Sequence, residues 1–272
     1  MSEIERNRLR NAERSVADLL EANRSAPGTV LLEMLNVSIG TTQRSLVSDF
    51  SIRVREGRVT ALVGASGSGK SLSARAMMGV LDVDPGLSAG SLRYPARSSR
   101  DWFEDVRGRG MGAQHTLLRA SESLRGGYVT YSPQSASSAL NPGRTVGRQL
   151  EMAIRRRETP PAEGMAAAVA QVLDEVGLPH RASRALVGEL SGGQAQRAAL
   201  AIAIAPNPAI MIADEPETGL DPVLRRVVTE LMINVARRHN VGLVLITHNK
   251  DTVDRIADDM VLIGEDPWAR YR

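Results

Sequence analysis

The sequence predicts an α/β protein whose central sheet is mostly parallel. Short apolar runs, typical of buried strands, alternate along the chain with segments of helical periodicity. One of these runs, Arg58 to Val63, leads into a glycine-rich loop and then into a helix. The chain has 272 residues, of which 42% are hydrophobic, so it is long enough to bury a sizeable core.

The first quarter of the chain predicts one helix followed by strands. Residues 1 to about 26 carry apolar residues at roughly helical spacing and end at Pro27-Gly28, which indicates an amphipathic surface helix or leader. A helix that docks a partner is the alternative. The runs VLLEMLNVSI and SDFSIRV predict two strands, Arg58 to Val63 predicts a third, and Ser71 to Leu81 predicts a helix.

The middle of the chain predicts an insertion and a helical block. Arg93 to Gly127 has weak periodicity and many Arg, Gly and Ser, which indicates an exposed, loop-rich insertion. Its part from 97 to 125 is longer than expected for an insertion at this point. GYVTYSPQ predicts a strand that ends at Gln134. Thr145 to about Gly177 is expected to be mostly helical, with a break at Thr159-Pro160-Pro161.

The last third of the chain predicts strands and helices in alternation. Helices are expected at Ser191 to Ala205, Asp221 to Arg238 and Lys250 to Asp259. The runs AIMIADE, GLVLITH and MVLI predict three buried strands between and after them.

Composition excludes several classes of function. The chain has no cysteine, so disulfides, thiolate metal sites and cysteine nucleophiles are excluded. The net charge is only +3 and aromatic residues are scarce, which argues against a nucleic-acid partner. The longest apolar run, Ala198 to Ala205, is far shorter than the ~20 residues of a spanning helix. The charged N-terminus lacks the apolar core of a signal peptide, so any membrane role is expected to act through a partner.

The stretch GASGSGKS, Gly64 to Ser71, has the pattern of a phosphate-binding loop. It matches G-x-x-x-x-G-K-[ST], with a strand before it and a helix after it. Glycines allow successive backbone N–H groups to point inward, and the helix N-terminus adds partial positive charge. Lys70 is expected to reach the β- and γ-phosphates of a nucleotide, and the Ser71 hydroxyl to ligate Mg²⁺.

A pair of carboxylates follows the run AIMI. Asp214 and Glu215 come at the carboxyl end of this strand, the edge where doubly wound sheets bind ligands. Asp214 is expected to hold Mg²⁺ through its water shell. Glu215 is expected to lie beside the γ-phosphate and to take a proton from the attacking water.

The segment ELSGGQAQR, Glu189 to Arg197, provides a second anion-binding helix end. Ser191 suits the N-cap, Gly192 and Gly193 leave the backbone bare, and the helix from Gln194 points its positive end outward. A phosphate loop alone does not separate kinases, GTPases, helicases and motor ATPases. This second site helps to separate these classes, because such a segment has no role in an ordinary P-loop kinase.

With these residues the chain resembles the ATP-binding cassette family. LSGGQ (Leu190 to Gln194) is similar to the family signature, Gln134 to its Q-loop residue, His248 to its switch histidine, and TGLDP with Asp221 to its D-loop. The resemblance covers about Leu31 to Gly264. It implies a P-loop NTPase (RecA-like) fold with a mostly parallel sheet, an antiparallel β N-terminal part and an inserted α-helical subdomain.

The resemblance also implies a division of the chain and a set of site residues. An N-terminal extension at 1–28 would precede an ATPase domain at 29–268, which contains a helical subdomain at about 135–190, and a tail at 269–272 would follow. Glu215, His248 and Lys70 would be catalytic, and Ser71, Gln134 and Asp214 would hold Mg²⁺. ATP would contact Gly64, Ala65, Ser66, Gly67, Ser68, Gly69, Lys70, Ser71, Leu72, Gln134, Asp214, Ser191, Gly192, Gly193, Gln194 and Asp221.

The mechanism implied is a head-to-tail pair of cassettes. The phosphate loop of one would face Ser191 and Gly193 of the other across an ATP, so that binding closes the pair and hydrolysis reopens it. The second cassette would be the same chain or a related one. The helical block would grip an integral-membrane permease, which places the protein in the cytoplasm against the inner face of the membrane. An extracytoplasmic binding protein would take part indirectly.

Details of the sequence resemble the dipeptide, oligopeptide and nickel import branch of the family. Ala139-Leu140-Asn141-Pro142 is similar to the element that follows the Q-loop in that branch, which implies import of peptides or nickel complexes. The departures include Ser135-Ala136 after Gln134, Glu217 and Asn249. Where the family stacks an aromatic residue on adenine, the chain reads VSIGTT, with Ile39 nearest. An ATPase of a soluble, non-transport complex is the alternative function, and a regulatory module that binds ATP with little turnover is a third.

Overall fold

The computed structural model describes residues 16–134, 139–218 and 220–264. The chain divides into two compact units. Unit 1 contains the described residues up to 122 and from 242 on, and unit 2 contains those between 123 and 241. Each unit is a set of strands with its own helices, and each carries part of the predicted site.

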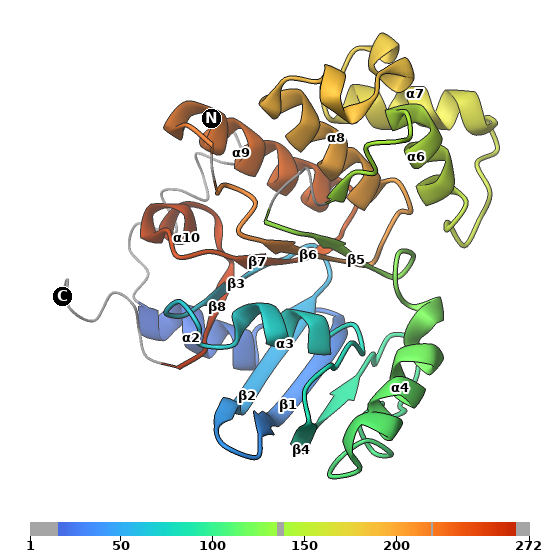
Figure 1. The fold of residues 1–272 in the computed structure, drawn as a ribbon. Helices are drawn as coiled ribbons and strands as arrows, with labels where there is room; N and C mark the ends of the chain where they lie inside the picture. Colours follow the sequence, from blue (N-terminus) through green and yellow to red (C-terminus); the bar gives the residue numbers. More distant parts are fainter. Residues whose placement is uncertain (1–15, 135–138, 219, 265–272) are drawn as a thin grey trace. The chain divides into compact units, whose positions relative to one another are not determined.

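A three-stranded antiparallel sheet begins unit 1 (Figure 1). Its central strand is β1 (Val30–Thr41), which pairs with β2 (Ser45–Arg55) on one side and with β4 (Pro85–Arg93) on the other. Buried and more exposed residues roughly alternate along β1 and β2, with interruptions at shifts in the β1–β2 register, as expected for a sheet with one face on the core. The sequence did not indicate β4, because PGLSAGSLR contains Pro, Gly and Ser, which are not typical of strands.

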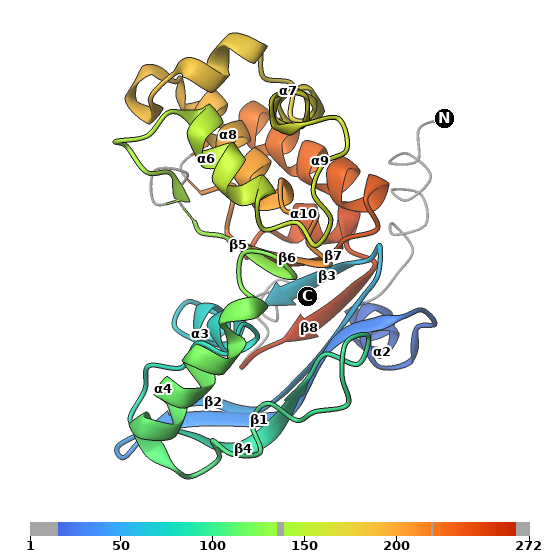
Figure 2. The same cartoon turned by 90° about the vertical axis from the view of Figure 1, so that its right-hand side faces the viewer.

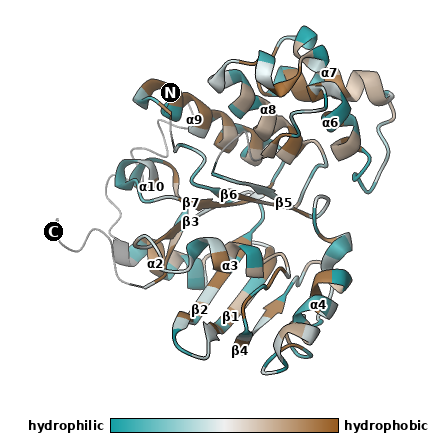
Figure 3. Ribbon diagram, viewed as in Figure 1, coloured by the Kyte–Doolittle hydropathy of each residue, from teal (hydrophilic) through white to brown (hydrophobic). Residues whose placement is uncertain are grey.

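Three parallel strands form the second sheet region of unit 1. Strand β3 (Val59–Val63) pairs with β7 (Gly242–Ile246) on one side and with β8 (Asp259–Leu262) on the other. All residues of β3 and β7 are buried, and Figure 3 draws β7 mainly in brown. This burial on both faces explains why these strands read as continuous apolar runs. Helix α3 (Lys70–Ala76) follows β3, and α10 (Lys250–Ile256) follows β7.

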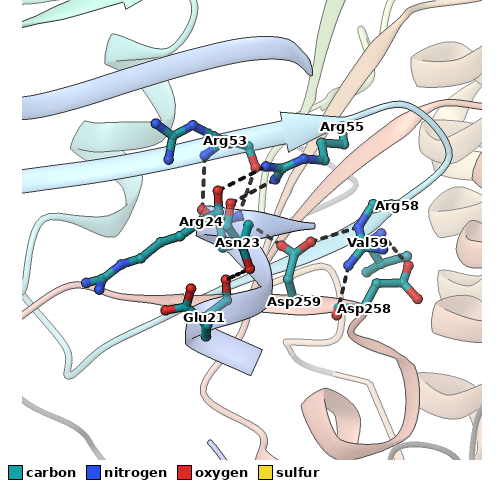
Figure 4. Close-up of polar contacts among 10 residues, drawn as sticks. Glu21, Asn23, Arg24, Arg53, Arg55, Arg58, Val59, Asp258 and Asp259 are labelled. Carbon is teal, nitrogen blue, oxygen red and sulfur yellow. Dashed lines mark hydrogen bonds and ion pairs between the residues drawn. The ribbon is translucent and has the colours of Figure 1, made fainter. Parts of the chain in front are cut away.

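Helix α2 (Val16–Ser25) is joined to unit 1 by buried contacts. Leu19 is 2% exposed and packs in a cluster with residues of β3, α10 and β8, namely Ala61, Val63, Val253, Ala257 and Met260. Asn23 is buried as well and bonds to β2 and β8 (Figure 4). This part of the predicted N-terminal helix therefore packs on the fold. The remainder of that helix lies outside the described residues.

The prediction of an exposed, loop-rich segment between Arg93 and Gly127 holds only in part, because residues 95–100 are exposed and 95–109 contain no helix or strand, but the rest is more ordered. The segment contains helix α4 (Gly110–Ala120) and a short 3₁₀ turn, Ser121–Ser123. Tyr94 and Phe103 are each no more than 1% exposed, and Asp101 accepts hydrogen bonds from the N–H groups of Leu92 and Phe103. The sequence did not predict this helix, because GMGAQHTLLRA contains two glycines and glycine is a poor helix former.

The described residues of unit 2 form two parallel strands and four α-helices, with short 3₁₀ turns between them (Figure 2). Strand β5 (Val129–Ser132) pairs with β6 (Ile210–Asp214). The helices are α6 (Val146–Ile154), α7 (Met165–Glu175), α8 (Gly192–Ile204) and α9 (Pro222–Arg238). The break predicted at Thr159-Pro160-Pro161 lies between α6 and α7. Among the described residues of both units, no helix is long and apolar enough to cross a bilayer.

Candidate nucleotide-binding site

The phosphate loop lies between β3 and α3 of unit 1. Gly67 and Gly69 have φ of 77° and 98°, the left-handed region that favours glycine. A Cβ at Gly69 would lie 2.7 Å from the Leu46 carbonyl oxygen, and one at Gly64 would lie 2.4 Å from that of Ile263. The loop thus folds tightly against β2 and against the segment that follows β8, which fixes the directions of its backbone N–H groups.

Two polar side chains of this loop fit a phosphate. Lys70 is 8% exposed, and its ammonium donates hydrogen bonds to the carbonyl oxygens of Gly64 (2.9 Å) and Ala65 (2.8 Å) within the loop. The Ser68 hydroxyl is buried in the loop without a hydrogen-bond partner among the described residues. A buried polar group without a partner is costly, and a phosphate oxygen is the type of acceptor that this hydroxyl lacks. The loop therefore fits the β- and γ-phosphates predicted for it.

His248 lies at the same sheet edge as the phosphate loop. Strands β3 and β7 are parallel neighbours in which Leu62 faces Ile246. The polypeptide leaves the sheet directly after each of these strands. His248 is exposed, whereas Thr247 before it is fully buried. Asn249, which departs from the family pattern, caps α10 by accepting a hydrogen bond from the Thr252 N–H. Asparagine serves well in this position, so the departure has a local structural reason.

Unit 2 brings together the carboxylates and the predicted Q-loop residue. Strands β5 and β6 are parallel, and Ser132 faces Ala213, so Gln134 and the pair Asp214-Glu215 follow at the same edge. The Gln134 side-chain amide donates a hydrogen bond to Oε2 of Glu215 at 3.3 Å. The same oxygen accepts a hydrogen bond from the Thr218 hydroxyl at 3.2 Å. Glu215 is thus oriented by two neutral donors.

The backbone of Glu215 is strained. Its φ is 44°, which is uncommon for a residue with a side chain. Such conformations cost of order 1–3 kcal/mol and concentrate at functional sites. Together with its two hydrogen bonds, this geometry fits the role of general base predicted for Glu215.

Unit 2 offers two of the donors predicted for Mg²⁺. Asp214 and Gln134 supply carboxylate and amide oxygens, ligand types that this ion prefers. Ser71, the third residue predicted to hold the ion, belongs to unit 1. Asp214 is 6% exposed, and its Oδ2 accepts a hydrogen bond from the Tyr131 hydroxyl at 2.8 Å. The sequence reasoning missed Tyr131 and Thr218. The parallel pairing of GYVTYSPQ with AIMIADE is the signal that could have found Tyr131.

The signature segment forms the N-terminus of α8. Ser191 is the N-cap: its hydroxyl accepts a hydrogen bond from the Gln194 N–H, and the Gln194 side chain accepts one from the Ser191 N–H. This reciprocal capping box leaves Gly192 exposed at the tip. A Cβ at Gly193 would lie 3.1 Å from Leu224, so glycine permits the close approach of α9. The tip therefore presents bare backbone N–H groups outward.

A buried hydrogen bond connects this helix to the carboxylate segment. The Gln196 amide donates to the carbonyl oxygen of Pro216 at 2.9 Å, directly after Glu215. Asp221 caps α9 by accepting hydrogen bonds from the N–H groups of Val223 and Leu224. Glu217 is only 4% exposed. The signature tip, the carboxylates and the predicted D-loop aspartate thus belong to one packed unit.

The other predicted positions are placed as follows. Leu72 is buried in α3, and Ile39 is 1% exposed within β1, so Ile39 offers no open face for adenine. Within unit 1 the phosphate loop and His248 share an edge, and within unit 2 Gln134, Asp214 and Glu215 do. Ser135, Ala136 and Gly219 lie outside the described residues. The catalytic, nucleotide-binding and metal-binding roles given to the site residues stay predictions.

Comparison with known proteins finds one family and many relatives. The family described as ABC transporter matches residues 47–218. The oligopeptide transport ATP-binding protein OppD of Lactococcus lactis is 32% identical over 240 residues, which cover 86% of this chain and 67% of that protein. The dipeptide transport ATP-binding protein DppD of Escherichia coli is 34% identical over 219 residues, which cover 80% of this chain and 63% of that protein. The chain thus spans about two thirds of the length of these curated relatives.

A solved structure supports the fold. It is titled as cbiO1 from Clostridium perfringens, part of the ABC transporter complex cbiONQ, and it matches with a TM-score of 0.65 at 19% identity over 86% of this chain and 84% of that one. At this identity the likeness bears on the fold alone. The predicted P-loop α/β fold is confirmed.

Proposed function

The chain belongs to the ABC transporter family, as the resemblance to the peptide import branch predicted, and we propose that it binds and hydrolyses ATP to drive an importer. The single observation that carries the proposal is the phosphate loop. Its backbone is bent by Gly67 and Gly69, Lys70 lies within it, and the buried Ser68 hydroxyl lacks a partner among the described residues. These features fit a triphosphate.

Glu215 and its hydrogen-bond partners would carry the hydrolysis step. Glu215 accepts a proton from the attacking water, and Gln134 and Thr218 hold its carboxylate in place. Asp214, Gln134 and Ser71 would hold Mg²⁺, which supplies positive charge that offsets the charge of the phosphates. His248 would contact the γ-phosphate. The Ser191 tip would contact the γ-phosphate of an ATP held by a second cassette, so that each ATP joins two subunits.

A groove in unit 2 supports a permease partner. It has a volume of about 340 Å³ and lies between the β5 side of the unit and helices α6 and α8. Its apolar lining includes Ala139, Met152, Ala153, Ala199, Ile202 and Pro206, and Arg144 and Arg156 add positive charge. We place a cytoplasmic segment of the permease in this groove. That contact would hold the protein at the inner face of the membrane.

The cargo class follows from the relatives. OppD and DppD are named as transport proteins for oligopeptides and dipeptides. We propose a peptide-type importer, with a second cassette of the same or a related chain and an extracytoplasmic binding protein that acts through the permease. The alternative, an ATPase of a soluble complex, predicts the same nucleotide chemistry without a membrane partner.

Co-purification from membranes tests the transporter assignment. The tagged chain should bring down a hydrophobic permease from solubilised membranes, and Met152→Asp should abolish this capture while ATP binding persists. Val227→Asp is the matched control, because Met152 is 43% exposed and Val227, on α9, is 42% exposed. Recovery of the chain only in soluble complexes, with ATP hydrolysis intact, would favour the alternative.

A further inference from the structure

Tyr131 connects two features of unit 2 that no sequence motif links. Its hydroxyl donates a 2.8 Å hydrogen bond to Oδ2 of Asp214, the carboxylate assigned to Mg²⁺. Strand pairing explains the contact: Tyr131 faces Ile212 across the parallel β5–β6 ladder, two residues before Asp214. The hydroxyl therefore reaches the carboxyl end of the neighbouring strand.

The same residue is also part of a different surface. Tyr131 also lines the groove formed with Met152 and Ala153 of α6 and with Ile202 of α8. Its side chain is only partly exposed, because α8 packs against β5. One residue thus has its hydroxyl on the Asp214 carboxylate and contributes to the lining of the groove.

We propose that Tyr131 is a positioning residue that holds Asp214 for Mg²⁺ and makes this carboxylate sensitive to occupation of the groove. The inference rests on the proposed function, since it assumes that Asp214 serves a magnesium nucleotide. It adds a physical link, through Tyr131, between the groove and the carboxylate assigned to Mg²⁺.

The positioning effect follows from the chemistry of the contact. A hydrogen bond from a phenol to a carboxylate is charge-assisted, so it restricts the rotation of the Asp214 side chain. With Oδ2 engaged by Tyr131, Oδ1 is the oxygen that would serve the metal or its water shell. Partners of this kind, which orient a metal-binding side chain, typically change metal affinity by about 10- to 100-fold when they are removed.

The link to the groove follows from the stiffness of the ring. A tyrosine side chain has only two main torsions, so a group that displaces the ring in the groove also displaces its hydroxyl. Filling the groove should therefore change how Asp214 is held, while removal of the hydroxyl should uncouple the two.

Magnesium-dependent nucleotide binding by the full chain tests the positioning role without a partner or turnover. The probe is a fluorescent ATP analogue, titrated with MgCl₂. Tyr131→Phe should raise the Mg²⁺ concentration for half-maximal binding by about tenfold, while binding at saturating Mg²⁺ is retained. Tyr94→Phe is the matched control, because Tyr94 donates its buried hydroxyl to the Met77 carbonyl in unit 1. Tyr94→Phe should lower thermal stability and leave the Mg²⁺ concentration for half-maximal binding within twofold of the wild-type value.

A double-mutant cycle tests the link to the groove. Ala153→Trp should fill the groove and shift the half-maximal Mg²⁺ concentration by threefold or more in the wild-type background. In the Tyr131→Phe background the same change should have no further effect, because contacts that act through one residue are not additive. Additive shifts, or no shift with Ala153→Trp, would overturn the link.

The outcomes separate this inference from the function on which it rests. If the wild-type chain shows no Mg²⁺-enhanced nucleotide binding, the proposed ATPase fails and the inference fails with it. If the wild-type chain responds to Mg²⁺ and Tyr131→Phe responds at the same concentration, only the positioning role is overturned.

Discussion

The side-chain amide of Asn23 donates a hydrogen bond of 2.9 Å to Oδ1 of Asp259, although 236 residues separate them in the sequence (Figure 4). Asp259 is fully buried in β8, and its second oxygen accepts a hydrogen bond from Arg58 at 3.0 Å. Asn23 also exchanges two hydrogen bonds with the backbone of Arg53. Helix α2 is thus tied to β2 and β8 by a network of hydrogen bonds centred on Asn23 and Asp259.

We predict that Asn23→Ala lowers the free energy of unfolding by about 2 kcal/mol. The substitution leaves Oδ1 of Asp259 and the backbone groups of Arg53 without their partner in a buried site, and each such loss costs roughly 1–3 kcal/mol. Urea unfolding of the full chain measures the change. Glu21→Ala, on the exposed face of the same helix, should stay within about 0.5 kcal/mol of the wild type. Equal stabilities of Asn23→Ala and Glu21→Ala would show that the network does not hold α2.

The two left-handed glycines of the phosphate loop should differ in their tolerance of alanine. Both substitutions carry a backbone cost of about 1–2 kcal/mol. At Gly67 the new Cβ meets nothing within 4 Å, whereas at Gly69 it would lie 2.6 Å from Val47 and 2.7 Å from the Leu46 carbonyl. Gly69→Ala should therefore reduce thermal stability well beyond Gly67→Ala. The comparison is made without nucleotide, and similar midpoints would contradict the packing described for this loop.

Asp101 predicts a pH-dependent contribution to stability. Burial raises the pKa of this carboxyl, but the hydrogen bonds from Arg107 and from the N–H groups of Phe103 and Leu92 outweigh burial, so the pKa lies below its ordinary value of 3.8. A lowered pKa stabilises the fold above the ordinary value, and this stability is lost as the pH falls through the lowered pKa.

Asp101→Asn should accordingly lower the unfolding midpoint at pH 7, with a smaller difference from the wild type near pH 3. Asp105→Asn serves as the control, because the Asp105 side chain is 74% exposed and its contact with Arg109 is a surface ion pair. Thermal scans across this pH range decide the question. A deficit for Asp101→Asn that does not change with pH would contradict the lowered pKa.

Glu215→Gln should stop turnover and preserve ATP binding. The amide keeps the shape of the side chain but cannot take a proton from water, and loss of a general base costs about 10²- to 10⁴-fold in rate. Phosphate release and binding of a fluorescent ATP analogue measure the two properties separately. Glu217→Gln, two residues further on, should keep its turnover. Normal hydrolysis by Glu215→Gln would remove Glu215 from its role as base.

Short-range patterns predicted the parts of the site, because they depend on residues close in the sequence. Gly64 to Ser71 lies between a strand and a helix as expected, and Ser191 caps its helix as its side chain suggested. Contacts across the sequence were missed. Nothing local indicates that Tyr131 meets Asp214 or that Asn23 meets Asp259, because strand pairing and helix packing create these contacts.

The fold was predictable where burial is continuous and less so where structure depends on distant partners. Strands β3, β6 and β7 are buried throughout, so their sequences are apolar and distinctive. Strand β4 gains its order from pairing with β1, and its own residues carry no strand signal. Helix α4 contains two glycines and was concealed by them. The side chains of Asp101 and Arg107 form a 2.6 Å ion pair, which helps to order the segment between β4 and α4.

Cross-linking tests the central claim that ATP joins the phosphate loop of one cassette to the signature tip of another. The chain has no native cysteine, so Ser66→Cys in one copy and Ser191→Cys in a second copy provide the only thiols. In the Glu215→Gln background, a short thiol-reactive linker should join the two copies when Mg²⁺ and ATP are present. Where a different cassette co-purifies with the chain, the second cysteine is placed at the signature serine of that cassette. ADP should not support the product. Equal cross-linking with ATP, with ADP and without nucleotide, or none in any of these conditions, would contradict the account.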